Sequence, residues 1–484
     1  MNRLRLIIKN TAGFLGSLIF NRFLNFLVTI ILVRYLGPKN LGQYTFVLTF
    51  AGLFALFCDL GIGQLVTREV SQDRTRAGSF LGNYLSLQLL LSSVVVVVMV
   101  IVINHFQYPH IIRLALYITG LNLLVVSLAQ PFFNIAIAFE KLRFTAIASI
   151  IGNIFYCLSL LAAVFFRKGL LILVSVSLVT SILEFFLVAF ICSRFCVKPI
   201  FKFNKLLWLT VARFFLPFAL YIVFTGLYRR IDIVMLSRMK TDIAVGFYGA
   251  AYKIIYLFIL IPTSFSRAVF PLLSQQAAED RIKLSQTVSW SMKYLLALGF
   301  PIAIIGSFFC REIILLLFGP EFLNSAVVLN ILIWVLVLVF WHSILSQALI
   351  AIKNMLAVVS GTIIAFILNV GLNFLLIPKY SYVGAAATTV FSELFIGLWF
   401  YLSLRKILPL KYSLYDFLKI VIASLIMILL FQLTYQFYFL IVITLGIVFY
   451  IIALYLLHFI GRGERVLLKE AFARKDGLFK RDAI

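Results

Sequence analysis

Four cationic residues lie deep within apolar stretches of the sequence. Arg22 occurs in IFNRFLNF, Lys253 occurs in GAAYKIIY, and Arg229 and Arg230 begin the segment RRIDIVML. A guanidinium group is planar and presents its N–H donors as a fork that fits two phosphate oxygens, whereas an ammonium group acts as a point charge. These residue types therefore indicate an anion site, and phosphate is the anion that suits arginine best.

One acidic residue follows the paired arginines, and the sequence leaves its role open. If the segment is helical, Asp232 lies one turn after Arg229, and the two side chains can form an ion pair. In that alternative Arg230 snorkels toward the membrane surface and the cluster is structural. In the other alternative, the cations Arg22, Arg229, Arg230 and Lys253 outnumber Asp232, and the surplus positive charge attracts an anion.

Further ionisable residues lie inside apolar runs, where a charged side chain costs on the order of 2.5–3.5 kcal/mol on insertion scales. They are Asp59, Glu184, His342 and Glu393. Buried polar groups of this kind commonly join neighbouring helices, and ion coupling is their other expected role. The candidates for coupling or gating are Asp59, Asp232, Glu393 and Arg34.

The elements that position these residues must cross a membrane. The chain has 484 residues, of which 63% are hydrophobic and 12% charged, and a mean hydropathy of +1.11. A bilayer core about 30 Å thick requires roughly 20 apolar residues of helix. The apolar runs are continuous and do not alternate with polar residues, which favours helices over the strands of a barrel.

The runs predict an all-α integral membrane protein with about fourteen transmembrane helices. The predicted spans are 10–33, 42–66, 79–103, 112–138, 144–166, 169–192, 213–237, 244–273, 288–310, 324–351, 355–377, 382–404, 415–434 and 437–458.

The basic charge is distributed asymmetrically. The net charge is +25, and most of the 42 Lys and Arg residues fall on the same side of the predicted spans as the N-terminus. The positive-inside rule then predicts that both termini are cytoplasmic. No long soluble segment is available to bind nucleic acid, so we expect the basic tail, 461–484, to lie against anionic lipid headgroups.

Metal and enzyme sites have no clear basis in the sequence. The five cysteines lie in or beside predicted spans and are interpreted as small apolar residues, because no His or carboxylate cluster accompanies the Cys192/Cys196 spacing. Neither a paired-carboxylate loop, an HExxH motif nor a phosphate-binding loop stands out. We therefore expect no metal, no cofactor and no catalytic activity.

The two halves of the chain repeat one another. Residues 32–44 align with residues 236–248 at a constant offset of 204, which matches Arg34 with Arg238, Gly42 with Gly246 and Tyr44 with Tyr248. FEKLRF and SILEFF match AIKNML and FSELFI in the same order at offsets near 210. Such repeats are typical of transporters that rock two bundles around a central site.

The repeat predicts two six-helix lobes and an appended helix pair. The expected divisions are 1–205 for the N-terminal lobe, 206–410 for the C-terminal lobe, and 411–484 for the helix pair and tail. The offset also places Asn25 of the first half where Arg229 stands in the second. Asn25 is therefore a further candidate for the central site, together with Arg22 one turn before it.

The N-terminal segment resembles a known family. Asn10, the run LGPKNLGQY, the triplet Asp59-Leu60-Gly61 and the triplet Thr67-Arg68-Glu69 are similar to the polysaccharide-biosynthesis flippases, which include O-antigen repeat-unit flippases. These proteins belong to the multidrug/oligosaccharidyl-lipid/polysaccharide exporter superfamily. Length, repeat and helix number extend the resemblance over the whole chain.

The resemblance implies an alternating-access transporter of the bacterial or archaeal inner membrane, with two lobes in a V and a cationic central cavity. Its implied cargo is an oligosaccharide repeat unit on undecaprenyl pyrophosphate, moved from the cytoplasmic to the outer leaflet, with polysaccharide polymerase machinery as a further partner. The pyrophosphate would bind the central cations. Candidate sugar contacts are Asn21, Asn25, Tyr221, Tyr228, Tyr252 and Tyr256. The last two helices would supply an apolar groove for the polyprenyl tail.

Three alternatives remain at the level of sequence. A multidrug exporter shares the implied fold but should favour carboxylates in its cavity, and a peptidoglycan lipid II flippase shares both fold and cationic cavity. A membrane polymerase or glycosyltransferase needs catalytic acids or metal ligands on sizeable polar loops, which are not evident here.

Overall fold

The computed structural model describes residues 3–201, 216–410 and 414–459, and in these residues the elements are helices without strands. The first half of the chain forms α1 to α6, which we call the N-lobe. Its elements are α1 (Arg3–Asp59), α2 (Ile62–Gln72), η1 (Arg74–Arg76), α3 (Ala77–His105), α4 (His110–Ala138), α5 (Leu142–Phe165) and α6 (Leu170–Phe195).

The second half forms α8 to α14, which we call the C-lobe, and the chain continues into a helical pair. The C-lobe elements are α8 (Leu216–Tyr228), α9 (Ile231–Met239), α10 (Asp242–Glu279), α11 (Arg281–Phe308), α12 (Cys310–Phe318), η2 (Pro320–Phe322), α13 (Ser325–Ala351) and α14 (Met355–Arg405). The pair is α15 (Leu414–Thr434) and α16 (Phe439–Leu456).

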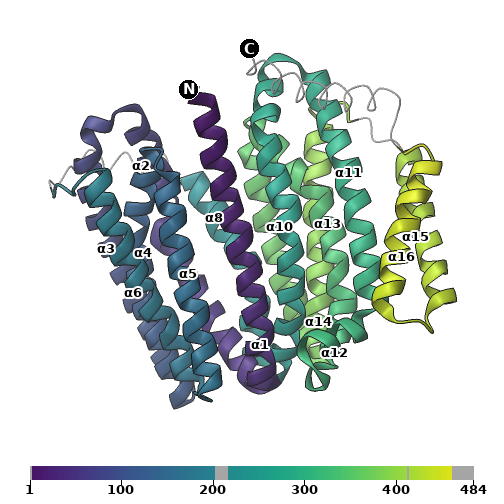
Figure 1. Ribbon diagram of the computed structural model, residues 1–484, viewed down its shortest axis with the longest axis horizontal. Helices are drawn as coiled ribbons and strands as arrows, with labels where there is room; N and C mark the ends of the chain where they lie inside the picture. Colours follow the sequence, from purple (N-terminus) through teal and green to yellow (C-terminus); the bar gives the residue numbers. More distant parts are fainter. Residues whose placement is uncertain (1–2, 202–215, 411–413, 460–484) are drawn as a thin grey trace, which may run out of the picture.

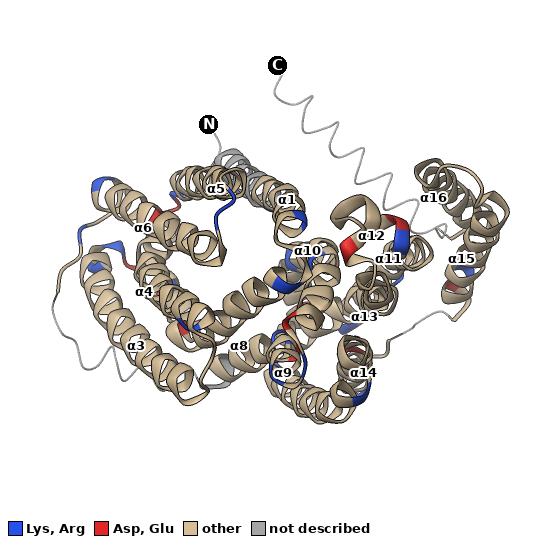
Figure 2. Ribbon diagram, turned by 90° about the horizontal axis from the view of Figure 1, so that it is seen from below, with Lys and Arg blue, Asp and Glu red and all other residues tan. Residues whose placement is uncertain are grey.

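The lobes are arranged side by side, and α1 is the N-lobe helix that lies beside the C-lobe (Figure 1). Seen from below, α1, α8, α9 and α10 lie in the middle of the molecule, and α15 and α16 pack at the edge of the C-lobe far from the N-lobe (Figure 2). Helix α10 is the main C-lobe neighbour of α1 and also packs against α13. Residues 244–251 of α10 are all buried, and the small residues among them let neighbouring helices approach closely.

Eleven described helices are long and apolar enough to cross a membrane. The count of fourteen is not confirmed by that criterion, because two pairs of predicted spans run together as single bent helices and the predicted span 213–237 is divided between the short helices α8 and α9. Helix α1 bends at Gly37, where φ is 65°, immediately before Pro38. Helix α14 bends at Ser381, where φ is 51°, three residues after Pro378. Proline removes a backbone donor, and the positive φ changes the chain direction without a long loop.

Two further predicted boundaries are wrong. The span 42–66 ends early, because α1 stops at Asp59, and Leu60 and Gly61 both have positive φ before α2 begins. The span 213–237 is interrupted between α8 and α9, at Arg229 and Arg230. The basic tail and the expected divisions after residues 205 and 410 fall in or beside segments outside the described residues.

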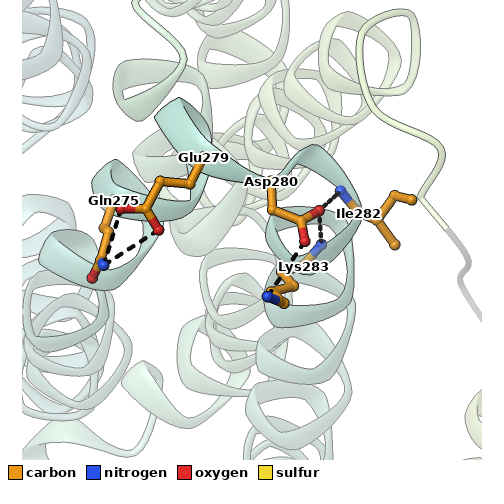
Figure 3. Close-up of polar contacts among 5 residues, drawn as sticks. All are labelled: Gln275, Glu279, Asp280, Ile282 and Lys283. Atoms are coloured by element: carbon orange, nitrogen blue, oxygen red, sulfur yellow. Dashed lines mark hydrogen bonds and ion pairs between the residues drawn. The ribbon is translucent and has the colours of Figure 1, made fainter.

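The connection from α10 to α11 is a tight turn closed by Asp280 (Figure 3). Its carboxylate accepts hydrogen bonds from the backbone N–H groups of Ile282 at 2.9 Å and Lys283 at 3.1 Å, and the Lys283 ammonium lies 3.5 Å away. These bonds satisfy donors at the start of α11 that have no partner within the helix. The hydrogen bond from the Lys283 N–H is the main cause that holds the pKa of Asp280 below its ordinary value. The cap therefore remains ionised at neutral pH.

Candidate functional site

The break between α8 and α9 determines where the paired arginines lie. The backbone N–H of Arg229 still bonds to Thr225 of α8 at 3.2 Å, whereas Arg230 precedes the first turn of α9 with φ −127° and ψ −18°. Arg229 is exposed and Arg230 is half-buried. The two arginines therefore lie where the regular helix stops, in the middle of the molecule beside α1 and α10.

The side chain of Arg230 connects the two lobes by a hydrogen bond to a backbone carbonyl group. Its Nη1 donates a hydrogen bond to the carbonyl oxygen of Gly52 in α1 at 2.8 Å. A Cβ atom added at Gly52 would lie 3.3 Å from the Arg230 Nε, so the glycine leaves the guanidinium the room it occupies. This bond uses one of the five N–H donors of the group, and no other hydrogen bond joins the guanidinium to a described residue.

Arg22 reaches across the lobes to an aromatic ring. Its guanidinium carbon lies 5.3 Å from the ring centroid of Tyr256 on α10, within the range of a cation–π interaction. Tyr256 is 51% exposed and is also close enough to Arg230 to interact electrostatically with it. Arg229 lies near Tyr252 and also near Arg230, whose like charge it repels. The structure thus gathers Arg22, Arg229 and Arg230 around the tyrosines of α10.

The cations of this site have no acidic partner among the residues that the structure describes. Within the described part of the chain, none of Arg22, Arg229, Arg230 and Lys253 forms an ion pair with a carboxylate. Lys253 lies on α10 one turn before Tyr256, so it belongs to the same side of that helix. Because two of the arginines contact groups of the opposite lobe, the surplus positive charge lies between the lobes.

Asp232 does not pair with Arg229, so the ion-pair alternative is wrong. The carboxylate is 3% exposed and accepts three hydrogen bonds inside the C-lobe, from Tyr248 at 3.0 Å, Thr389 at 2.9 Å and Asn373 at 2.6 Å. Asn373 also donates to Asn369 at 3.0 Å. Burying a carboxylate costs free energy, and hydrogen bonds from neutral donors offset only part of that cost because they do not neutralise the charge.

The other acidic coupling candidates form contacts of their own. Glu393 of α14 contacts the Nε2 of His342 in α13 at 2.7 Å, and both side chains are largely buried. Asp59 accepts hydrogen bonds from Tyr84 at 2.6 Å and from the backbone of Gly63 at 3.2 Å, so it joins α1, α2 and α3. The side chain of Asn25 points into the N-lobe, where its oxygen accepts a hydrogen bond from the thiol of Cys157 at 3.5 Å.

Arg34 belongs to a separate contact between the lobes, at the end of the molecule where α12 lies (Figure 1). Its Nε donates to the carbonyl oxygen of Leu317 in α12 at 2.8 Å, and its Nη2 donates to that of Leu316. Nearby, Gln43 of α1 donates to the Asp242 carboxylate of α10 at 2.9 Å.

The repeated segments meet at this end, and we call the contact between residues 37–42 and 242–246 the lobe joint. A Cβ atom at Gly42 would lie 1.8 Å from the carbonyl oxygen of Asp242, and one at Gly246 would lie 1.9 Å from that of Pro38. Equivalent glycines of the two repeats thus pack reciprocally on the opposite backbone. The sequence revealed the repeat but not this contact, although two aligned glycines were a signal for a close approach.

The chain matches known protein families, and it is similar in sequence and in fold to named proteins. A family model described as polysaccharide biosynthesis protein matches residues 7–277, and a second, MatE, matches residues 217–375. The chain is 24% identical over 389 residues to the "Probable low-salt glycan biosynthesis flippase Agl15" of Haloferax volcanii, covering 77% of this chain and 78% of that protein. It is 27% identical over 331 residues to the "Putative O-antigen transporter" of Shigella flexneri, covering 62% and 74% respectively.

Two solved structures share the fold. One is a lipid II flippase MurJ in an inward closed conformation, with a TM-score of 0.75, 19% identity, and coverage of 92% of this chain and 98% of that one. The other is an inward-facing multidrug resistance MATE family transporter of the MOP superfamily, with a TM-score of 0.68, 16% identity, and coverage of 80% and 95%. At these identities the similarity is one of fold, and it agrees with the two-lobed helical architecture.

Proposed function

Because this chain belongs to the polysaccharide biosynthesis protein family, we propose that it is a membrane flippase for lipid-linked oligosaccharide repeat units in surface polysaccharide biosynthesis. The cargo is an oligosaccharide on undecaprenyl pyrophosphate, which moves from the cytoplasmic to the outer leaflet of the inner membrane. The observation that carries the proposal is the group of cations between the lobes without an acidic partner in the described residues. A diphosphate supplies the missing negative charge, and arginine binds it bidentately.

The charge asymmetry and the lobe joint support the orientation that this proposal requires. The excess of Lys and Arg on the side where α1 starts supports cytoplasmic termini. With that orientation the lobe joint lies on the outer side, and we propose that the state with a closed joint receives cargo from the cytoplasm. Release requires the lobes, divided near residues 205 and 410, to separate at the joint and close at the cytoplasmic end.

An apolar cavity supports a place for the polyprenyl tail beside the appended helices. It measures about 440 Å³ and lies between α11, α13, α14 and α15. Its walls include Leu296, Phe300, Val337 and Leu414, with few polar groups among them. A lipid chain can occupy such a cavity without losing its apolar surroundings while the charged and sugar-bearing end enters between the lobes.

Transport itself tests the proposal. Proteoliposomes that contain the purified chain and fluorescent undecaprenyl diphosphate-linked disaccharide are treated with a membrane-impermeant quencher or glycosidase. A flippase exposes the inner-leaflet fraction within the assay time, whereas protein-free liposomes do not. If the loaded proteoliposomes protect the same fraction as protein-free liposomes, the proposed function is rejected.

We further propose that Asp232 couples transport to an ion. Its buried carboxylate has neutral partners only, and the side-chain oxygen of Asn373 has no partner among the described residues, so a cation or proton would complete the cluster. Asp232→Asn keeps the shape and removes the charge. We expect an imposed sodium or proton gradient to accelerate wild-type flipping and to leave the rate of the variant unchanged. Equal acceleration of both proteins would contradict the assignment, as would a wild type that responds to neither gradient.

A further inference from the structure

The N-lobe contains a polar cavity separate from the arginine cluster. It measures about 370 Å³, lies between α1, α5 and α6, and is lined by hydroxyl, amide and carboxyl side chains at every position except Gly152. Polar walls of this kind are costly inside a membrane bundle unless they contact water or a ligand. The cavity therefore needs an occupant that can form many hydrogen bonds.

Several groups in the cavity have unused hydrogen-bonding capacity. Asn21 is 9% exposed, and its amide nitrogen donates to Ser149 at 3.3 Å, whereas its side-chain oxygen has no partner among the described residues. Ser177 and Thr180 donate their hydroxyl protons to carbonyl oxygens of α6 at 2.6 and 2.8 Å, which leaves both oxygens as acceptors. The cavity is thus rich in acceptors that receive no hydrogen bond from a described residue.

Glu184 gives the cavity its chemical preference. Its carboxyl group forms no hydrogen bond or ion pair that joins it to another described residue, and no Lys or Arg lines the cavity. A Cβ atom at Gly152 would lie 3.5 Å from the Glu184 carboxyl carbon, so the glycine keeps open the space beside it. A carboxylate without a neighbouring cation repels anions and accepts hydrogen bonds from hydroxyl groups, which favours a neutral sugar and disfavours an acidic one.

The position of the cavity connects it to the anion site. Asn21 and Asn25 lie one turn apart on α1 and line the cavity, while Arg22 between them contacts Tyr256 of the opposite lobe. The two sites therefore adjoin at one turn of α1, as a diphosphate and its first sugar do in the cargo. We propose that this cavity, which we call the Glu184 cavity, binds the neutral sugar nearest the diphosphate, and that Glu184 accepts hydrogen bonds from the hydroxyl groups of that sugar. This inference rests on the proposed function.

The test separates the contribution of the sugar from that of the diphosphate. The purified chain in nanodiscs is titrated with undecaprenyl diphosphate, with undecaprenyl diphosphate-N-acetylglucosamine, and with the analogue that carries glucuronic acid as first sugar. We expect the wild type to bind the N-acetylglucosamine probe about tenfold more tightly than the bare diphosphate, as a hydrogen bond to a charged group allows. The glucuronic acid probe should show no such advantage.

Two variants alter the Glu184 cavity in different ways. Glu184→Gln removes the charge at nearly constant shape, and Gly152→Leu fills the space beside it. Both should lose most of the advantage of the N-acetylglucosamine probe while binding undecaprenyl diphosphate as the wild type does. Ser175→Ala is the matched control, since Ser175 lies on α6 outside the cavity lining and donates to Leu171.

The outcomes distinguish this inference from the function on which it rests. If the cavity variants keep the full advantage of the N-acetylglucosamine probe, the sugar site is wrong and the flippase proposal stands. A wild type that prefers the glucuronic acid probe also overturns the sugar site alone. If the wild type binds none of the three probes, both proposals are overturned.

Discussion

Alanine at both Arg22 and Arg229 is expected to abolish transport of the lipid-linked oligosaccharide while the protein still inserts into the membrane. The two guanidinium groups lie on opposite lobes, and neither has an acidic partner among the described residues, so neither is needed to neutralise a buried charge. Each charge-assisted hydrogen bond to a phosphate contributes about 1.5–3 kcal/mol. Loss of two therefore predicts diphosphate binding weaker by a factor of about 100 or more.

The measurement is flipping in proteoliposomes together with membrane abundance in cells. Lysine at either position should restore only part of the rate, because it cannot form the bidentate contact, whereas Lys253→Arg should be tolerated. The matched control is the double variant Arg194→Ala and Arg405→Ala, which removes two exposed arginines at the ends of α6 and α14. Wild-type flipping by the Arg22/Arg229 double variant would reject the phosphate role of these arginines.

Alanine at Gly42 or Gly246 is expected to prevent the lobe joint from closing and to stop transport. The added methyl carbon would lie 1.8 or 1.9 Å from a backbone carbonyl oxygen, far closer than any contact that a flexible side chain can relieve. Because both neighbours are backbone atoms, the lobes must separate at this end. The cycle would then lack the state that receives cargo, and flipping should fall to the protein-free background.

Spin labels on Lys39→Cys and Glu321→Cys report the joint directly, because these exposed residues belong to opposite lobes beside it. The distance between the labels should increase in both glycine variants relative to the wild type. Gly371→Ala is the matched control, since Gly371 is an exposed helical glycine whose Cβ would meet no atom within 4 Å. An unchanged label distance together with normal flipping would show that the joint tolerates the methyl group.

Much of the architecture could be predicted because membrane insertion imposes a simple rule on length and polarity. Apolar runs of about 20 residues predicted most spans, including α15 and α16 to within two residues at each end. The repeat was visible because the lobes reuse the same loop. The bends were not visible, since Gly37 and Ser381 change the chain direction inside runs whose composition continues unchanged.

The candidate site was predicted in its residue types but not in its contacts. Depth in the membrane singled out Arg22 and Arg230, yet their partners, Tyr256 and the Gly52 carbonyl, depend on packing between segments that are distant in the sequence. Spacing along an uninterrupted helix suggested that Asp232 pairs with Arg229. The helix break and the donors of α10 and α14 give Asp232 other partners, and these long-range contacts are not encoded by local spacing.

The position of the bound diphosphate tests the account most directly. A cryo-electron microscopy structure of the chain with undecaprenyl diphosphate-N-acetylglucosamine should show phosphate density between the lobes, within hydrogen-bonding distance of Arg22 and Arg229. Phosphate density on the outer surface of either lobe, with the central arginines unoccupied, would contradict it.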